Sequence, residues 1–100
     1  MVFTWDRAKA ASNRRKHGVG FEDAVRVFDD PLHLTVQDRI ENNEQRWQTI
    51  GRVHGAVILL VTHTITEGGS EPLETGPVET IRIISPRAAT RRERKLYADG

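Results

Sequence analysis

The chain contains no cysteine and no long apolar run. Without cysteine it can form no disulfide, no thiolate nucleophile and no Cys-ligated zinc site, which fits a reducing compartment. The longest apolar run covers residues 56–61, far below the roughly 20 residues that cross a bilayer. No apolar stretch follows a basic start at the N-terminus, as a secretory signal would require. These absences predict a cytoplasmic protein with no membrane contact.

The sequence also lacks the short motifs that hold common cofactors. It contains no Gly-rich phosphate loop, no Gly-x-Ser-x-Gly elbow and no dinucleotide-binding fingerprint. Four histidines are present, but no two are spaced four apart on an expected helix or as His-x-His on an expected strand. We therefore expect neither a cofactor nor a metal site.

Positive charge is concentrated at the two ends of the chain. Residues 1–20 contain five Lys/Arg and one acid, residues 21–80 contain four and eleven, and residues 81–100 contain six and two. The net charge of +1 therefore conceals two basic segments and an acidic middle. If the ends meet in the fold, they could bind a polyanion; otherwise the charges only keep the surface solvated.

The order of the sequence patterns predicts an α+β fold. One hundred residues with 37% hydrophobic and 29% charged side chains fit a single domain spanning residues 1–100. We expect two N-terminal helices, about four mainly antiparallel strands and a C-terminal helix. The expected helices cover residues 6–17, 21–28 and 90–98, and the expected strands cover residues 34–37, 46–53, 57–65 and 79–85.

Cap and turn residues delimit these elements. Asp6 can cap the first helix, and Gly18 can end it in the left-handed conformation. Pro86 is expected to break the last strand, and Thr90 with Glu93 has the spacing of a capping box. Turns are expected at residues 42–43 and 54–55, and an exposed loop is expected at residues 66–78.

The first helix carries a candidate phosphate-binding cluster. Lys9, Asn13 and Lys16 fall on one face, and His17 follows one turn beyond Asn13. Two ammonium groups, an amide and an imidazole can hold a phosphate, and the imidazole can accept a proton. The alternative is structural, because basic residues near a helix C-terminus offset its dipole and cover its surface.

The last strand and helix form a second candidate site. Strict alternation places Arg82 on one face of the strand and Ser85 on the other. A guanidinium on a half-apolar face needs an anion, which could be a protein carboxylate or a substrate phosphate. Arg87 and Arg94 follow, with Tyr97 able to stack or to donate a hydrogen bond, although some of these residues must be plain surface.

Three other polar or aromatic residues fit the core better than a site. His63 shares a strand face with apolar neighbours, which predicts a satisfied core histidine rather than a catalytic one. Trp5 and Trp47 are also expected in the core, with base stacking by Trp5 as the alternative.

Three motifs follow one another along nearly the whole chain. They are Trp5-Asp6-x-x-Lys9-Ala10-x-x-Asn13-x-x-Lys16-His17-Gly18-Val19-x-Phe21-Glu22-x-Ala24 followed by Val27-Phe28-x-Asp30-Pro31, then Glu44-x-Arg46-Trp47-x-x-Ile50-Gly51, then Ile81-Arg82-Ile83-Ile84-Ser85-x-Arg87-x-Ala89-Thr90-x-x-Glu93-Arg94-x-x-Tyr97. The pattern resembles the BrnT family of toxins from bacterial type II toxin-antitoxin pairs. The resemblance implies a RelE-like fold and a small ribonuclease held inactive by a BrnA-type antitoxin. The chain departs from the family in its long 66–78 segment and in Pro86, which stands where a small residue is usual.

Together, residues and resemblance predict a metal-independent endoribonuclease that inhibits translation and growth. Arg82 and Arg87 would clamp the phosphate, while His17, with Glu93 as second choice, transfers the proton. The expected RNA-binding residues are Lys9, Asn13, Lys16, Arg94 and Tyr97. The expected partners are RNA and the antitoxin in a hetero-oligomer, with DNA reached only through the antitoxin. The alternatives are a non-catalytic module that binds nucleic acid or protein, and one half of an obligate hetero-complex.

Overall fold

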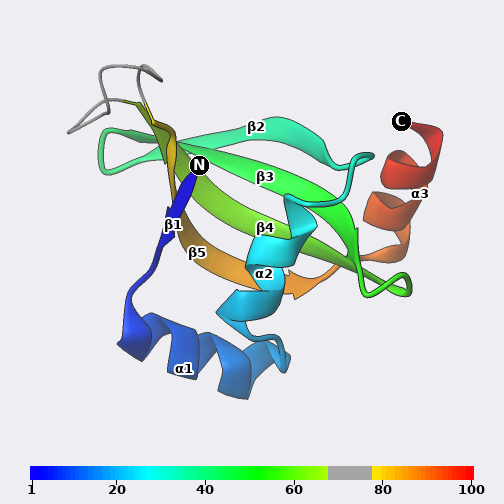
Figure 1. The fold of residues 1–100 in the computed structure, drawn as a ribbon, viewed down its shortest axis with the longest axis horizontal. Helices are drawn as coiled ribbons and strands as arrows, with labels where there is room; N and C mark the ends of the chain where they lie inside the picture. The colour runs from blue at the N-terminus through cyan, green and yellow to red at the C-terminus, as the bar shows by residue number, and fades with distance from the viewer. Residues whose placement is uncertain (68–77) are drawn as a thin grey trace.

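The fold is built on a five-stranded mixed sheet with the strand order β1-β5-β4-β3-β2 (Figure 1). The computed structural model describes residues 1–67 and 78–100. The elements are β1 Val2–Thr4, α1 Arg7–His17, α2 Phe21–Val27, β2 Leu34–Glu41, β3 Glu44–Val53, β4 Val57–Thr66, β5 Thr80–Ala88 and α3 Arg91–Asp99. The predicted α+β class and its three helices are confirmed, whereas most of the loop expected at 66–78 lies outside the described residues.

The sheet has one strand more than predicted. β1 pairs in parallel with β5, with Phe3 opposite Ile81, and β2 to β5 form the antiparallel part. A segment of three residues is too short to show a two-residue period. Its partner lies far along the chain, so only the folded structure reveals this strand and the mixed character of the sheet.

Both predicted hairpin turns are present. Asn42 and Asn43 connect β2 to β3 with φ angles of 54° and 62°, and His54 and Gly55 begin the next turn with 54° and 72°. Positive φ at two consecutive turn positions matches the right-handed twist of the flanking strands. The helix caps also form: the Asp6 carboxylate accepts the Lys9 N–H at 3.0 Å, and Gly18 adopts φ 72°.

β5 continues through Pro86, contrary to the predicted break. Pro86 pairs with Val61 of β4, and β1 pairs only with residues 80–82 of β5. At Pro86 the outer edge of β5 therefore has no strand partner in the described chain, so the missing N–H removes no ladder hydrogen bond. The Pro86 carbonyl instead accepts a hydrogen bond from Asn13 Nδ2 at 2.9 Å, which fastens α1 to this edge.

A one-residue bulge in β5 changes which side chains share a face. Ile83 pairs with His63 and Ser85 pairs with the adjacent Thr62, leaving Ile84 as the extra residue. The strict alternation predicted for this strand is therefore wrong beyond Ile83. Ser85 lies on the same face as Arg82, because a bulge shifts the alternation by one residue, a feature that periodicity alone does not show.

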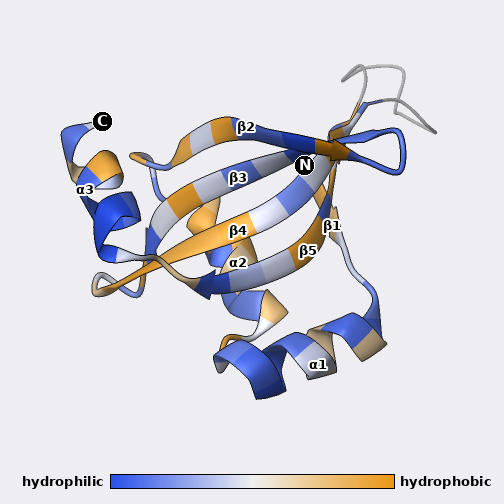
Figure 2. Ribbon diagram, turned by 180° about the vertical axis from the view of Figure 1, so that it is seen from behind, coloured by the Kyte–Doolittle hydropathy of each residue, from blue (hydrophilic) through white to orange (hydrophobic). Residues whose placement is uncertain are grey.

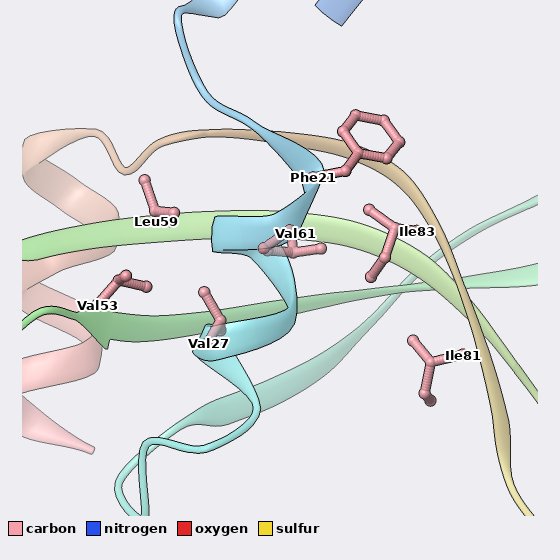
Figure 3. Close-up of a cluster of buried hydrophobic side chains, with 8 residues drawn as sticks. Phe21, Val27, Val53, Leu59, Val61, Ile81 and Ile83 are labelled. Atoms are coloured by element: carbon pink, nitrogen blue, oxygen red, sulfur yellow. The ribbon is translucent and has the colours of Figure 1, made fainter. Parts of the chain in front are cut away.

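α1 lies along the β5 edge of the sheet (Figure 1), and α2 covers one face and buries the main core. Its buried members are Phe21, Ala24, Val27, Val53, Leu59, Val61, Ile81 and Ile83 (Figure 3). Gly51 lets α2 approach β3 closely, because a Cβ there would lie 2.8 Å from Val27 Cγ1. Trp5 packs edge-on against Phe21 with ring centroids 6.0 Å apart, in agreement with its predicted core position.

His63 is the satisfied core histidine that the sequence predicts. Its side chain is fully buried, and its Nδ1 donates to the Thr64 carbonyl at 3.2 Å. Nε2 then accepts from the Thr49 hydroxyl at 2.7 Å. Burial lowers the pKa of His63, so the neutral ring is the stable form.

The other face of the sheet is covered at one end only. α3 packs there through Tyr97 against Ile50 and Leu60. The remainder of this face carries mostly polar residues and has no helix over it (Figure 2). We call it the open face; it comprises the side chains that β3, β4 and β5 direct away from α2.

Asp30 ties α3 to the rest of the molecule. Its Oδ2 accepts the Tyr97 hydroxyl at 2.5 Å and the Arg52 backbone N–H at 2.8 Å, and its Oδ1 accepts the Leu32 N–H at 2.9 Å. Burial would raise the pKa of Asp30, but these donors outweigh it and the pKa lies below its ordinary value. The same bond raises the pKa of Tyr97.

Replacing Asp30 by Asn should lower the free energy of unfolding by about 1 to 3 kcal/mol, because three donors lose a charged acceptor. A group whose pKa is depressed by folding stabilises above its unfolded pKa and loses that effect as pH falls. The loss in Asp30→Asn should therefore shrink below about pH 4. Urea denaturation at pH 7 and pH 3 measures both, with the exposed Asp29→Asn as the control that stays within about 0.5 kcal/mol. Equal stabilities of the two variants would contradict this role.

Candidate active site

Four arginines lie on the open face; Arg52 stands over the Tyr97 ring, 5.9 Å from its centroid, and the other three concern the site. Arg82 of β5 pairs with Thr64 of β4, and Arg87 pairs with Leu60. Thr64 and Leu60 are four residues apart, so their side chains lie on the same side of β4. Arg46 of β3 precedes Trp47, which pairs with His63 and faces the helices, so Arg46 faces the open side. The bulge is what brings Arg82 and Arg87 to one face of the sheet.

Arg87 is held by Glu93 of α3 in a two-pronged ion pair. Nη1 donates to Oε1 at 2.8 Å and Nη2 donates to Oε2 at 2.9 Å, the geometry in which guanidinium and carboxylate bind most strongly. Glu93 is itself fixed by the predicted capping box with Thr90. The hydrogen bonds from Arg87 hold the pKa of Glu93 at about 2, so both groups are charged at neutral pH.

Arg82 and Arg46 share a different carboxylate. Arg82 Nη2 donates to Glu44 Oε1 at 2.6 Å, and Arg46 Nη2 lies 3.9 Å from the same oxygen. Arg46 Nη1 lies 3.4 Å from Glu41 Oε2. The anionic partner that Arg82 requires is thus a protein carboxylate in the free chain.

Arg82 and Arg87 are not positioned as one clamp. Their partners on β4, Thr64 and Leu60, are four residues apart, which is about 13 Å at roughly 3.3 Å per residue. Each guanidinium is bound to its own carboxylate, and no contact joins the two in the described chain. The face therefore offers two separate cationic points along β5.

The predicted cluster on α1 is only partly assembled. Asn13 is buried, with 9% of its surface exposed, and its Oδ1 accepts the Ser85 hydroxyl at 2.9 Å. Both ends of its amide thus bond to β5, which gives Asn13 a structural role, and its predicted contact with RNA stays a prediction. Lys9, Lys16 and His17 are exposed, and no side-chain bond joins them to Arg82, Arg87 or Glu93 within the described residues.

The two basic ends of the chain meet along β5 but not at one point. α1 lies beside β5, as predicted, and its last turn, which ends at His17, points toward the end of β5 that bears Arg87 (Figure 1). α3 packs instead on β3. His17 is thus near the Arg87 end of the strand, and Arg82 lies at the other end beside β1.

Tyr97 and Arg94 are also used by the fold. Tyr97 is 9% exposed and its hydroxyl donates to Asp30, so the fold uses the hydrogen bond that was one of its two predicted roles, and its contact with RNA stays a prediction. Arg94 Nη1 donates to the Ala89 carbonyl at 2.9 Å and the residue remains exposed. Of these two, Arg94 has the more accessible surface for RNA.

Sequence reasoning did not identify Arg46 and Glu44 as site residues. The signal was present, because Trp47 and Thr49 alternate with them along β3, and on that side Thr49 is buried while Trp47 is half-buried beside His63. Period-two alternation then directs Glu44, Arg46 and Gln48 to the open face. Their proximity to Arg82 depends on the pairing of three strands, which no local pattern reveals.

The described residues contain neither a metal-ligand cluster nor a membrane-spanning helix. No group of three or more His, Asp or Glu side chains there could hold a metal ion. None of the described helices is long and apolar enough to cross a membrane.

Comparison with known proteins identifies the family. A family model described as the ribonuclease toxin BrnT of type II toxin-antitoxin systems matches residues 5–93. The chain belongs to the BrnT family. The crystal structure of the Brucella abortus ribonuclease toxin BrnT is similar, with a TM-score of 0.59 and 25% identity over 91% of this chain and 100% of that one. A comparison with curated proteins found no match.

Membership of the BrnT family makes the chain a ribonuclease toxin of a type II toxin-antitoxin system. Such a toxin has an antitoxin partner. Residues 5–93 include every predicted site residue except Arg94 and Tyr97. The open face and its arginines thus lie within the part of the chain that defines the family.

Glu93→Gln should lower the free energy of unfolding by about 1 to 3 kcal/mol at pH 7, because it breaks the fork with Arg87 and half of the capping box. The folded pKa of about 2 lies below the ordinary 4.5. The stabilisation is therefore complete above about pH 5 and disappears as the pH falls toward 2.

Thermal or urea unfolding of the wild type and Glu93→Gln between pH 2 and pH 7 measures this difference. Asp99→Asn, in the last turn of the same helix, is the matched control and should be neutral or slightly stabilising, since it removes a negative charge from a helix C-terminus. If the loss of unfolding free energy in Glu93→Gln does not change with pH, the negative charge of the Glu93 carboxylate is not what stabilises the fold.

Proposed function

We propose that this BrnT-family toxin is a metal-independent endoribonuclease that cuts RNA on the open face of its sheet. The observation that carries the proposal is Arg87 held in a fork by Glu93, with Arg82 on the same face. Cleavage needs fixed positive charge where the phosphoryl oxygens become more negative. Guanidinium groups oriented by carboxylates supply that charge without a metal.

In this mechanism Arg87 stabilises the charge that develops on the scissile phosphate. Its half-buried guanidinium, 32% exposed, is oriented before RNA binds, so little reorganisation is needed during the reaction. Arg82 holds the chain through a second phosphate. Lys9, Lys16 and Arg94 are exposed cations that attract flanking phosphates.

Proton transfer is assigned to His17. Glu93, with a pKa of about 2, is too weak a base to take the ribose 2′-hydroxyl proton efficiently at neutral pH, so its part is to orient Arg87. The last turn of α1 points toward the Arg87 end of β5 (Figure 1). His17 is exposed there and can reach an RNA strand that runs along this edge.

The same surface explains how an antitoxin would neutralise the toxin. A BrnA-type antitoxin that places acidic or hydrogen-bonding side chains over the arginines blocks RNA by competition and by steric exclusion. DNA is then contacted only by the antitoxin in the toxin-antitoxin complex. Without the antitoxin, RNA cleavage in the cytoplasm inhibits translation and arrests growth.

A non-catalytic RNA-binding module is the second candidate. It is favoured by one observation, that Arg82 and Arg87 are each already neutralised by a carboxylate. Such a module would retard labelled RNA in a native gel without shortening it, and the shift would weaken with salt. The proposed ribonuclease instead produces shorter fragments in the presence of a chelator.

Arg82→Ala should raise the KM for RNA cleavage about tenfold and weaken growth arrest, because a charged contact with a flanking phosphate of the substrate is lost. The control is Arg26→Ala, since Arg26 is exposed on α2, away from the open face; it should remain toxic. Colony counts after induction without antitoxin, together with circular dichroism of both variants, measure the effect. Full toxicity of a folded Arg82→Ala protein would remove Arg82 from the mechanism.

A further inference from the structure

Arg46 is poorly paired for an arginine so far from solvent. Its side chain is 13% exposed, and its Nε is buried with no hydrogen-bond partner among the described residues. Its two carboxylate neighbours, Glu41 and Glu44, are 3.4 and 3.9 Å away. The fork between Arg87 and Glu93 is closed at 2.8 and 2.9 Å, so Arg46 is held much more loosely.

A largely buried guanidinium with unmet hydrogen bonds does not stabilise a fold. Removing the charge from water costs free energy, and loose ion pairs offset little of that desolvation penalty. An apolar residue at position 46 would serve the sheet better. The retained charge therefore indicates a ligand that the free chain does not hold.

The shared carboxylate oxygen shows what kind of ligand fits. Glu44 Oε1 lies between two guanidinium groups, 2.6 Å from Arg82 and 3.9 Å from Arg46. A phosphoryl oxygen placed here can accept hydrogen bonds from both arginines, and a phosphate offers further oxygens for the donors that Glu44 leaves unmet. Glu44 is 36% exposed on a strand end beside a turn, so its side chain can swing away.

We propose that Arg46 and Arg82 together form a phosphate subsite for RNA, and that Glu44 occupies this subsite until RNA displaces it. The inference rests on the proposed function, because the ligand is a phosphate of the RNA substrate. Arg87 lies about 13 Å along β5 from Arg82 by the spacing of strand residues. The subsite therefore takes a phosphate other than the one at Arg87, and it contributes to binding rather than to bond cleavage.

Arg46→Met tests the subsite directly, since methionine keeps the apolar stem and removes the charge. The KM for RNA cleavage should rise about tenfold while kcat changes less than about threefold, because a charged hydrogen bond to substrate is lost. The slope of log Kd against log salt should fall by about 0.7, one phosphate contact. The probe for Kd is a fluorescent single-stranded RNA with 2′-O-methyl groups, which cannot be cut by its own 2′-hydroxyl. Arg26→Met, at an exposed position of α2 on the opposite face of the sheet, is the control and should leave KM, kcat and the salt slope unchanged.

Glu44→Gln tests whether Glu44 occupies the phosphate subsite in the free protein. If Glu44 competes with phosphate, this variant should bind the 2′-O-methyl RNA roughly two- to fivefold more tightly than the wild type, as expected for loss of one partly exposed ion pair. If Glu44 only forms a structural ion pair, the variant should bind this RNA more weakly than the wild type, or no more tightly. Asp38→Asn, a charge change on the neighbouring β2, controls for the general effect of removing a negative charge.

The outcomes separate this inference from the proposed function. An unchanged KM and salt slope in Arg46→Met, or weaker binding in Glu44→Gln, in a protein that still cuts RNA would overturn the subsite alone. A wild type that neither cuts nor binds RNA would overturn the proposed function. If Arg46→Met does not fold by circular dichroism, Arg46→Lys replaces it and should keep the salt slope but raise KM, because a lysine retains the charge without the fork.

Discussion

The bulge at Ile84 is the feature on which the open face depends. Arg82 and Arg87 are five positions apart, so a regular strand would direct one of them into the core beneath α2. With the extra residue, both reach the open side, where carboxylates and solvent meet their charge. The bulge breaks the ladder with β4, and the contact of Asn13 with Ser85 and Pro86 holds the outer edge of β5 in place. The local irregularity of β5 thus places two cations on one surface of the sheet.

Carboxylates determine how those cations act. Glu93 fixes Arg87 through two hydrogen bonds, and α3, which carries Glu93, is itself held by the bond between Tyr97 and Asp30. Orientation of the guanidinium therefore traces back to a carboxylate at the end of α2. On the other half of the face, one oxygen of Glu44 lies between two arginines. It is 2.6 Å from Arg82 and 3.9 Å from Arg46, so Arg46 is held only loosely. In the proposed function, Glu93 orients a charge for catalysis, and Glu44 occupies a phosphate position until RNA binds.

Local signals in the sequence were sufficient for much of the fold. Helix caps at Asp6 and Thr90, the hairpin turns and the buried His63 follow from residue chemistry within a few positions, and the structure has all of them. β1, the bulge and the passage of β5 through Pro86 depend on pairing between distant segments. For the same reason, the pairing of Arg87 with Glu93 could not be read from two residues on different elements. Asn13 had the pattern of a binding residue, and only the position of α1 against β5 shows that it is structural.

The proposed binding of RNA to the open face is tested most directly by NMR of arginine side chains. The 2′-O-methyl RNA is titrated into ¹⁵N-labelled protein while the Nε–H signals of the arginines and the backbone amides are recorded. Binding to the open face shifts the side-chain signals of Arg46, Arg82 and Arg87, and the backbone amides of β3 and β5 shift with them. Shifts confined to α1 around Lys9 and Lys16, with the three arginine signals unmoved, would show that RNA binds elsewhere.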